Sequence, residues 1–283
     1  QMYAQADSAL ENGNPEAMNE LKEQFGENPY ELKNILKYWV RSDKEGLRVI
    51  PTDSIVMKID KEAVRRSGMK IPEALGDSIP EEMTILLRDA NGNPKRALYK
   101  SELMMLEMLS EANWERPIYI AVSVGRENQL NMENHFVQEG LAYRFTPFDT
   151  SKTGVTIDSE KMYDNLMNKF KFGGIDKPGI YIDENAMRMC HSHRRIFSQL
   201  VQQLMREGKK DKAKAALDYA EKMIPAYNVP YDWQNGAVQM AEAYYQLGAT
   251  AKADEMMTAL ADKAVKYPTR YLRMDDKRRM LST

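Results

Sequence analysis

Apolar residues near the start of the chain recur at the spacing of amphipathic helices. Positions 14–15 and 28–29 both read Asn-Pro, and an Asx N-cap followed by proline is a typical helix start. The apolar residues behind these starts are Met18, Leu21, Phe25, Leu32, Ile35, Leu36 and Trp39. They recur every three or four residues, so we predict two helices that each bury one face.

From residue 50 onward the apolar period becomes that of a strand. Ile55, Met57 and Ile59 alternate with polar residues, which is typical of a half-buried strand. The β-prone run 84–87 is followed by the turn sequence Asn-Gly-Asn-Pro at 91–94. We therefore predict two strands and a turn in this stretch.

A helix and a continuous apolar strand follow this turn. Ser101 is a typical N-cap, and the leucines behind it recur at helical spacing. The run 118–124 is apolar except at Ser123, and such strands are usually buried on both faces of a mostly parallel sheet. Strand, helix and strand in this order predict a βαβ unit. The further elements that we expect are a helix through Phe136 and Val137, a strand at 141–145, a helix at 158–170 and a short strand at 180–182.

The last third of the chain contains helix formers and an internal repeat. Between residues 197 and 225, small and apolar residues fall at the offsets of the tetratricopeptide repeat, in which two antiparallel helices approach closely. Forty positions after Leu204, Gly208, Ala213 and Leu217 stand, in order, Tyr244, Gly248, Ala253 and Met257. A standard repeat has about 34 residues, so we assign the excess to a linker at 227–232. This predicts two helical hairpins and a closing helix near 271–281.

Together these elements predict an α+β fold in three parts. The N-terminal helices occupy residues 1–49, and an α/β domain with a mixed sheet containing the βαβ unit occupies 50–185. An all-α, tetratricopeptide-like domain of helical hairpins occupies 186–283. With 283 residues, of which 43% are hydrophobic, the chain is long enough to build a core in each of its larger parts.

The charge balance argues against a nucleic-acid partner. The chain has 40 Lys and Arg against 42 Asp and Glu, a net charge of -2, whereas neutralising a phosphate backbone requires an excess of basic residues. No apolar run approaches the roughly 20 residues of a membrane-spanning helix, so we expect the chain as given to be soluble. Its first residue is Gln1, and neither a start Met nor a signal peptide is visible, which indicates a fragment.

No constellation of residues predicts a catalytic or metal centre. The chain lacks the GxSxG, HExxH, CxxC and phosphate-loop sequences. Cys190, His191 and His193 form a cluster of soft ligands, but His191 leaves the helix face that the other two share, and a fourth ligand is missing. We therefore predict no metal, no cofactor and no catalytic residue in this chain.

Four stretches of the sequence resemble one known family. They are Asn113–Ala121 (NWERPIYIA), Glu139–Arg144 (EGLAYR), Tyr163–Gly174 (YDNLMNKFKFGG) and Gly179–Asn185 (GIYIDEN). In this order, before a tetratricopeptide-like tail, they are similar to the C-terminal region of large Bacteroidetes inner-membrane proteins that form a family of unknown function. The multi-pass N-terminal half of those proteins resembles protein O-mannosyltransferases, which use lipid-linked sugar donors. The resemblance covers nearly the whole chain.

The resemblance implies a soluble domain on the periplasmic side of the bacterial inner membrane. Its partner would be the membrane-embedded N-terminal half of the same protein, and the catalytic acid would lie in that half. No catalytic residue is carried over to this chain. Many relatives have tryptophan where this chain has Phe170 and Phe172.

The leading hypothesis is a non-catalytic module that positions protein acceptors or partner subunits for a membrane glycosyltransferase. Helical hairpins form grooves that hold peptide segments, so we expect a protein or peptide partner to contact side chains of the inner helices. The candidate residues are Arg195, Gln199, Gln202, Tyr244 and Tyr245.

Two alternatives remain open at this stage. The α/β domain could be an enzyme or bind a glycan or sugar phosphate near Gly125, Arg126 and Asn128, because ligands of open α/β sheets bind at the carboxyl ends of strands. The whole chain could also be purely structural, and brace or dimerise the membrane half.

Overall fold

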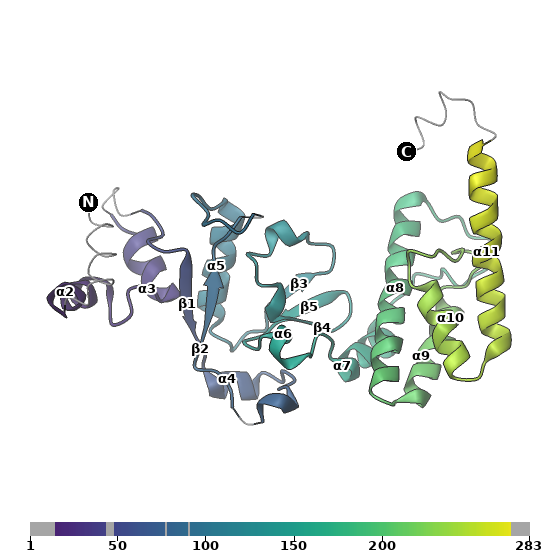
Figure 1. Ribbon diagram of the computed structural model, residues 1–283, viewed down its shortest axis with the longest axis horizontal. Coiled ribbons are helices and arrows are strands. Elements are labelled where there is room, and N and C mark those ends of the chain that lie inside the picture. Colours follow the sequence, from purple (N-terminus) through teal and green to yellow (C-terminus); the bar gives the residue numbers. More distant parts are fainter. Residues whose placement is uncertain (1–14, 44–47, 77, 90, 273–283) are drawn as a thin grey trace. The chain divides into compact units, whose positions relative to one another are not determined.

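The computed structural model of the protein describes residues 15–43, 48–76, 78–89 and 91–272 (Figure 1). Its contacts divide the chain into two compact units. The first, the α+β unit, comprises residues 1–138 and 142–156, and the second, the helical unit, comprises residues 139–141 and 157–283. The α+β class that the sequence predicts is confirmed. The three-part division at residues 49 and 185 stays a prediction.

The α+β unit contains short helices and two small sheets. Its helices are α2 (Pro15–Phe25), α3 (Leu32–Asn34), η1 (Ile35–Val40), α4 (Lys61–Arg66), η3 (Glu73–Leu75), α5 (Lys100–Ala112), η4 (Arg126–Asn128), η5 (Glu133–His135) and α6 (Thr150–Thr153). Its strands are β1 (Ser54–Lys58), β2 (Glu82–Leu86), β3 (Tyr119–Ala121), β4 (Phe136–Gln138) and β5 (Ala142–Phe145). Strands are thus present at four of the predicted positions, in β1, β2, β3 and β5.

All of the strand pairs in these sheets are antiparallel. β1 pairs with β2 so that Val56 lies opposite Thr84. In the second sheet the order is β3-β5-β4, and the central strand β5 runs antiparallel to both neighbours. Buried side chains alternate with exposed ones along β2 and β3, and with half-buried or exposed ones along β1, as expected for sheets with one covered face.

The predicted βαβ unit and mostly parallel sheet are therefore wrong. β2 and β3, the strands on either side of α5, belong to different sheets. The apolar run 118–124 forms only a three-residue edge strand, in which Tyr119 and Ala121 are exposed. A short apolar run does not reveal whether one face or both are covered, since pairing partners decide that.

Three local predictions also need correction. Phe136 and Val137 lie in strand β4, because pairing with β5 overrides the helical spacing of this short segment. Residues 180–182 form no strand. The second N-terminal helix begins at Leu32, because the side chain of Asn28 instead accepts a hydrogen bond from the backbone of Tyr30 at 3.2 Å and closes a turn.

Aromatic side chains organise the core of the α+β unit. Trp114 is buried just after α5, where its indole Nε1 donates to the carbonyl oxygen of Lys58 at 2.9 Å. Its ring stacks on Phe145 of β5 with a centroid distance of 5.3 Å. Phe25 and Trp39 stack in the same way at 4.3 Å. Such pairs stabilise more than their buried area alone. The first joins the end of α5 to β5, and the second joins α2 to η1.

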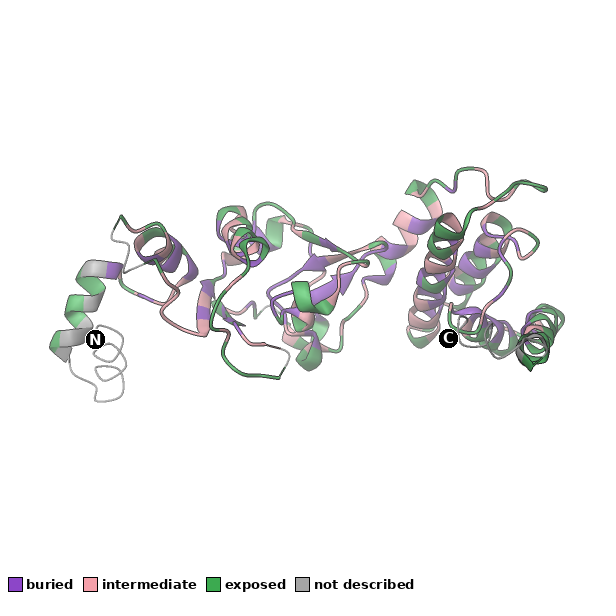
Figure 2. Ribbon diagram, turned by 90° about the horizontal axis from the view of Figure 1, so that it is seen from above, coloured by how far each residue is buried: buried purple, intermediate pink, exposed green. Residues whose placement is uncertain are grey.

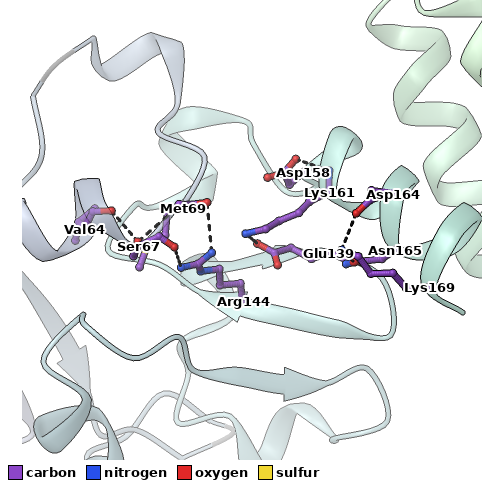
Figure 3. A network of polar contacts seen from close by, with 11 residues as sticks. Val64, Ser67, Met69, Glu139, Arg144, Asp158, Lys161, Asp164, Asn165 and Lys169 are labelled. Atoms are coloured by element: carbon purple, nitrogen blue, oxygen red, sulfur yellow. Dashed lines mark hydrogen bonds and ion pairs between the residues drawn. The ribbon is translucent and has the colours of Figure 1, made fainter.

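A buried arginine fastens the turn after α4 to strand β5 (Figure 3). Arg144 is 2% exposed, and its guanidinium donates to the carbonyl oxygens of Ser67 at 2.7 Å and Gly68 at 3.4 Å. The hydroxyl of Ser67 in turn donates to Val64 at 2.7 Å. A buried guanidinium needs acceptors for its N–H groups, and hydrogen bonds from a charged group are strong, so these contacts stabilise the turn.

The helical unit consists of six helical segments within the described residues. They are α7 (Ser159–Asp164), η6 (Asn165–Lys169), α8 (Glu184–Arg206), α9 (Lys210–Met223), α10 (Ala237–Gln246) and α11 (Thr250–Leu272). Figure 2 shows that the helices turn their buried faces toward one another. Most of the closing helix predicted near 271–281 lies outside the described residues. None of the described helices combines the length and the apolarity needed to cross a membrane.

The two hairpins, α8–α9 and α10–α11, have matching turns. Gly208 and Gly248 adopt positive φ angles of 72° and 76°. In the first turn the N–H of Lys209 donates to Leu204 at 2.9 Å, and in the second Ala249 donates to Tyr244 at 2.9 Å. These are the bonds of a glycine-terminated helix. The structure therefore repeats after 40 residues, as the sequence does.

The segment 139–141 is held within the helical unit by polar contacts (Figure 3). Glu139 forms an ion pair with Lys161 at 3.3 Å, and its carbonyl oxygen accepts a hydrogen bond from Asn165 Nδ2 at 2.7 Å. A Cβ atom on Gly140 would lie 3.4 Å from the ring of Phe170. These contacts fix the segment against α7 and η6.

Replacing Arg144 with methionine tests its role in the α+β unit. Methionine keeps much of the apolar stem but leaves the carbonyl oxygens of Ser67 and Gly68 without these donors, so the free energy of unfolding should fall by about 3 kcal/mol. Urea unfolding followed by tryptophan fluorescence measures the change. Arg126→Met, at an exposed position, should leave the transition nearly unchanged. Equal midpoints for the two variants would contradict the assignment.

Candidate functional site

Helix α8 presents a buried apolar face and an opposite polar face. Its start is fixed by Asp183, whose carboxylate accepts hydrogen bonds from the N–H groups of Asn185 at 2.8 Å and Ala186 at 3.0 Å. The polar face carries, at intervals of three and four residues, Arg195, Gln199, Gln202 and Arg206. Side chains at this spacing lie along one side of a helix.

A second polar row lies on α10, which packs beside α8 (Figure 1). Gly236 is the N-cap of α10 and has a φ of 84°. A Cβ atom there would lie 2.3 Å from Ser198 Oγ and 3.2 Å from the Cα atom of Arg195, so glycine permits the close approach of the two helices. The polar residues that follow on α10 are Gln239, Glu242 and Gln246.

The two rows border a shallow groove of about 310 Å³, the α8–α10 groove. Its lining residues are Gln202, Met205, Arg206, Gln239, Glu242, Ala243 and Gln246. Gln239 Oε1 is buried and has no hydrogen-bond partner among the described residues. Gln246 Nε2 donates to Glu242 Oε1 at 3.4 Å. Amides, a guanidinium and a carboxylate together offer both donors and acceptors, which is what a peptide backbone requires.

Three of the five predicted partner-binding residues lie on the polar face of α8. Gln202 lines the groove, Gln199 is half-buried one turn earlier, and Arg195 is exposed near the start of α10. The structure therefore brings these three side chains into one row.

The two predicted tyrosines lie elsewhere. Tyr244 is 1% exposed, and its hydroxyl donates to Asp218 of α9 at 3.2 Å, so it belongs to the core between the hairpins. Tyr245 is exposed, but its hydroxyl is hydrogen-bonded to Asp254 of α11. Neither tyrosine lines the α8–α10 groove.

Sequence reasoning missed the groove residues Arg206, Gln239, Glu242 and Gln246. The 40-residue offset of the repeat could have predicted the positions on α10. Forty positions after Gln199 stands Gln239, and forty after Gln202 stands Glu242. By the same rule Tyr244 takes the place of Leu204, a fully buried residue. The repeat thus separates groove positions from core positions.

The irregular segment 224–236 joins the two hairpins, and a buried arginine holds it. Arg194 of α8 is 1% exposed. Its guanidinium donates to three backbone carbonyl oxygens, those of Ile224 at 2.7 Å, Val229 at 2.8 Å and Pro230 at 3.2 Å. Burial lowers the pKa of this guanidinium, but arginine remains charged in proteins, so these are charge-assisted hydrogen bonds.

The side chains of Tyr231 and Glu221 lie beside the Arg194 guanidinium. Its carbon lies 5.1 Å from the centre of the Tyr231 ring, and the Tyr231 hydroxyl is hydrogen-bonded to Glu221. Burial raises the pKa of the Glu221 carboxyl above its usual value, and the Tyr231 hydrogen bond and the charge of Arg194 offset this rise only in part. The segment is therefore fixed to α8 and α9 by one connected polar cluster.

The turn between α8 and α9 is fixed to α7 by a second cluster. Glu207 accepts hydrogen bonds from Ser159 Oγ at 2.6 Å and Gln203 Nε2 at 2.9 Å, and pairs with Lys209 at 2.6 Å. Burial alone would raise the pKa of Glu207, but the hydrogen bonds from Lys209, Ser159 and Gln203 outweigh it and lower the pKa to about 2. Lys209 also pairs with Glu160 at 2.7 Å.

The alternative ligand site near residue 125 was predicted from a parallel sheet, which the structure does not contain at this place. Gly125 caps the short helix η4, and Arg126 and Asn128 are exposed on it. A Cβ atom on Gly125 would meet the side chain of Glu127. Because β3 is an edge strand of an antiparallel sheet, these residues do not border the crevice that parallel strands form at their carboxyl ends.

The cysteine and histidine cluster lies on α8. Cys190 is buried, and burial raises the pKa of its thiol. The ring of His193 stands edge-on to Phe170 at 5.8 Å and Phe172 at 6.0 Å, while its Nδ1 lies 2.7 Å from the Met189 carbonyl oxygen. Across the described part of the chain, no three potential metal ligands gather in one place.

The fold and the groove define the class: an α+β protein with a unit of repeated helical hairpins. Residues 3–165 match the family model of TMEM260-associated domain 2. Since this match covers more than half of the chain, the chain belongs to that family. TMEM260 is related to protein O-mannosyltransferases, so the match bears out this part of the resemblance. A comparison with curated proteins finds no match, and neither does one with solved structures.

Replacing Arg194 with leucine tests whether its hydrogen bonds hold the segment 224–236. The change leaves three carbonyl oxygens without their donor, so we expect the free energy of unfolding of the helical unit to fall by about 3 kcal/mol or more. Urea unfolding followed by circular dichroism gives the value. Arg195→Leu, one residue along the same helix but exposed, is the matched control. If both variants unfold alike, Arg194 does not hold the segment.

Glu207 should give the helical unit a recognisable pH dependence. Its pKa is lower in the folded chain than in the unfolded one, so its contribution is full above about pH 4.5 and is lost as the pH falls toward about 2. Glu207→Gln should therefore destabilise by about 2 kcal/mol at neutral pH and by little near pH 2.

Denaturation midpoints over this pH range test the prediction. Glu255→Gln, which removes an exposed carboxylate from α11, should show no comparable loss at neutral pH. A constant difference between Glu207→Gln and wild type at every pH would refute the ionic role of Glu207.

Proposed function

We propose that this chain is the non-catalytic periplasmic part of a Bacteroidetes membrane protein whose other half is an O-mannosyltransferase-like glycosyltransferase. Its tetratricopeptide-like hairpins hold an extended segment of a protein acceptor or of a partner subunit in the α8–α10 groove. Membership in the family of TMEM260-associated domain 2 supports the membrane-enzyme context. Matching hairpin turns support the repeat architecture.

One observation carries the binding role: equivalent positions of two repeats meet across the groove. Gln202 and Arg206 on α8 correspond, forty positions later, to Glu242 and Gln246 on α10, and all four line the groove. Helical repeats bind extended peptides through the residues that successive repeats place on one surface. The buried and unpartnered Oε1 of Gln239 adds a specific reason for a ligand, because a backbone N–H would satisfy it.

The groove favours a polar, extended segment over an apolar helix. Of its lining residues only Met205 and Ala243 are apolar. Glutamine amides pair with both the N–H and the C=O of a peptide, and Arg206 can pair with a carboxylate of the segment. Recognition of the backbone suits a module that must accept several protein acceptors, because the backbone is common to all of them.

The proposal is tested with the full-length parent protein in cells. Gln202→Ala combined with Gln239→Ala removes one amide from each side of the groove, and sugar transfer to acceptor proteins should fall about thirtyfold if each amide contributes about 1 kcal/mol. The melting temperature of the chain should not change. Gln234→Ala, at an exposed position before α10, serves as the control. Unchanged transfer in the double variant, or equal loss in the control, would overturn the proposal.

A further inference from the structure

The α+β unit contains a second candidate site, a hollow of about 520 Å³ that we call the α5 hollow. It lies between the segments 48–52 and 95–100 and the first turn of α5. Sites for small molecules usually measure about 300 to 1,000 Å³, so the α5 hollow is large enough to hold one. It is formed entirely by residues of the α+β unit and is separate from the turn at residue 125.

The floor of the α5 hollow is apolar. Its half-buried side chains, which pack against the core from one side, are Val40, Val49, Ile50, Leu98 and Leu103. Leu87, a core residue that also lines the hollow, is 4% exposed. Half-buried aliphatic groups around one hollow still present apolar surface to solvent, and covering it with an apolar chain is favourable.

The rim of the α5 hollow is basic. Its charged lining residues are Arg48, Lys95, Arg96 and Lys100, and no acidic residue lines it within the described ranges. Lys95 forms an ion pair with the buried carboxylate of Glu102, which is 3% exposed. Arg96 and Lys100 make no ion pair with any described residue. Arg48 donates from Nε to the carbonyl oxygen of Ser42 at 3.0 Å, so its two terminal amino groups remain available to an anion.

We propose that the α5 hollow binds an amphipathic anion: an apolar chain covers the floor, and a phosphate group is held at the rim by Arg48, Arg96 and Lys100. A phosphate carries up to two negative charges and several acceptor oxygens, which matches three cations that surround one opening. Guanidinium groups pair with phosphate through parallel hydrogen bonds. An uncharged sugar would leave these cations without a counter-charge and the aliphatic floor uncovered.

Octyl phosphate, used below its critical micelle concentration, is the probe for this site. Isothermal titration calorimetry with the whole chain should show binding that is at least about tenfold tighter than that of octanol or of inorganic phosphate, because only octyl phosphate engages both rim and floor. If octanol or inorganic phosphate binds as tightly as octyl phosphate, the proposal fails.

Two exposed cations provide the decisive variant. Arg96→Gln combined with Lys100→Gln should weaken octyl phosphate binding about tenfold, since it removes two of the three rim charges. The control combines Arg66→Gln and Lys70→Gln, which remove two charges of the same unit away from the hollow. Equal weakening in both double variants would mean that only net charge matters, and would overturn the site.

A second arm identifies the source of the phosphate group. Phosphatidylcholine vesicles that contain phosphatidic acid are sedimented with the chain. Co-sedimentation that octyl phosphate abolishes assigns the natural ligand to a membrane lipid, whereas calorimetric binding without co-sedimentation assigns it to a free amphipathic anion. Co-sedimentation that the Arg96→Gln and Lys100→Gln variant retains in full counts against the hollow. This outcome is independent of the α8–α10 groove, which these variants leave intact.

Discussion

The buried guanidinium of Arg194 is the interaction on which the arrangement of the helical unit depends. The segment 224–236 forms no helix or strand, yet Ile224 and Val229 are buried. The Arg194 side chain donates to the carbonyl oxygens of both and to that of Pro230. Because the segment ends at Gly236, which touches α8 directly, the same contacts position α10 and so set the shape of the α8–α10 groove.

The α+β unit uses the same device in a different setting. Arg144 satisfies carbonyl oxygens of the turn after α4, and Trp114 satisfies that of Lys58. Both residues lie in stretches that carry the family resemblance, and so does Asn165, which holds the carbonyl oxygen of Glu139. These stretches therefore contribute the framework of each unit. The two surfaces that we propose for binding, the α8–α10 groove and the α5 hollow, lie outside these stretches.

Local signals predicted the elements that depend on local chemistry. Asp158 and Asp183 cap helices because each carboxylate accepts from backbone N–H groups two or three residues ahead. The alternation at 55–59 predicted β1 correctly. For the site, the face of α8 was predicted through Gln199 and Gln202, but Tyr244 was placed on the surface although its repeat equivalent, Leu204, is a core residue. Aromatic character at a helix position does not distinguish an exposed side from a buried one.

The sequence by itself determined the α+β class, the 40-residue helical repeat and the absence of any familiar catalytic motif, because caps, periodicity and spacing act over a few residues. Only the tertiary structure decided that the sheets are antiparallel, that Arg194 and Arg144 are buried donors, and which cations surround the α5 hollow. Those features join residues far apart in the chain, such as Arg48 and Arg96. Their energies depend on burial and pairing, which a sequence pattern does not specify.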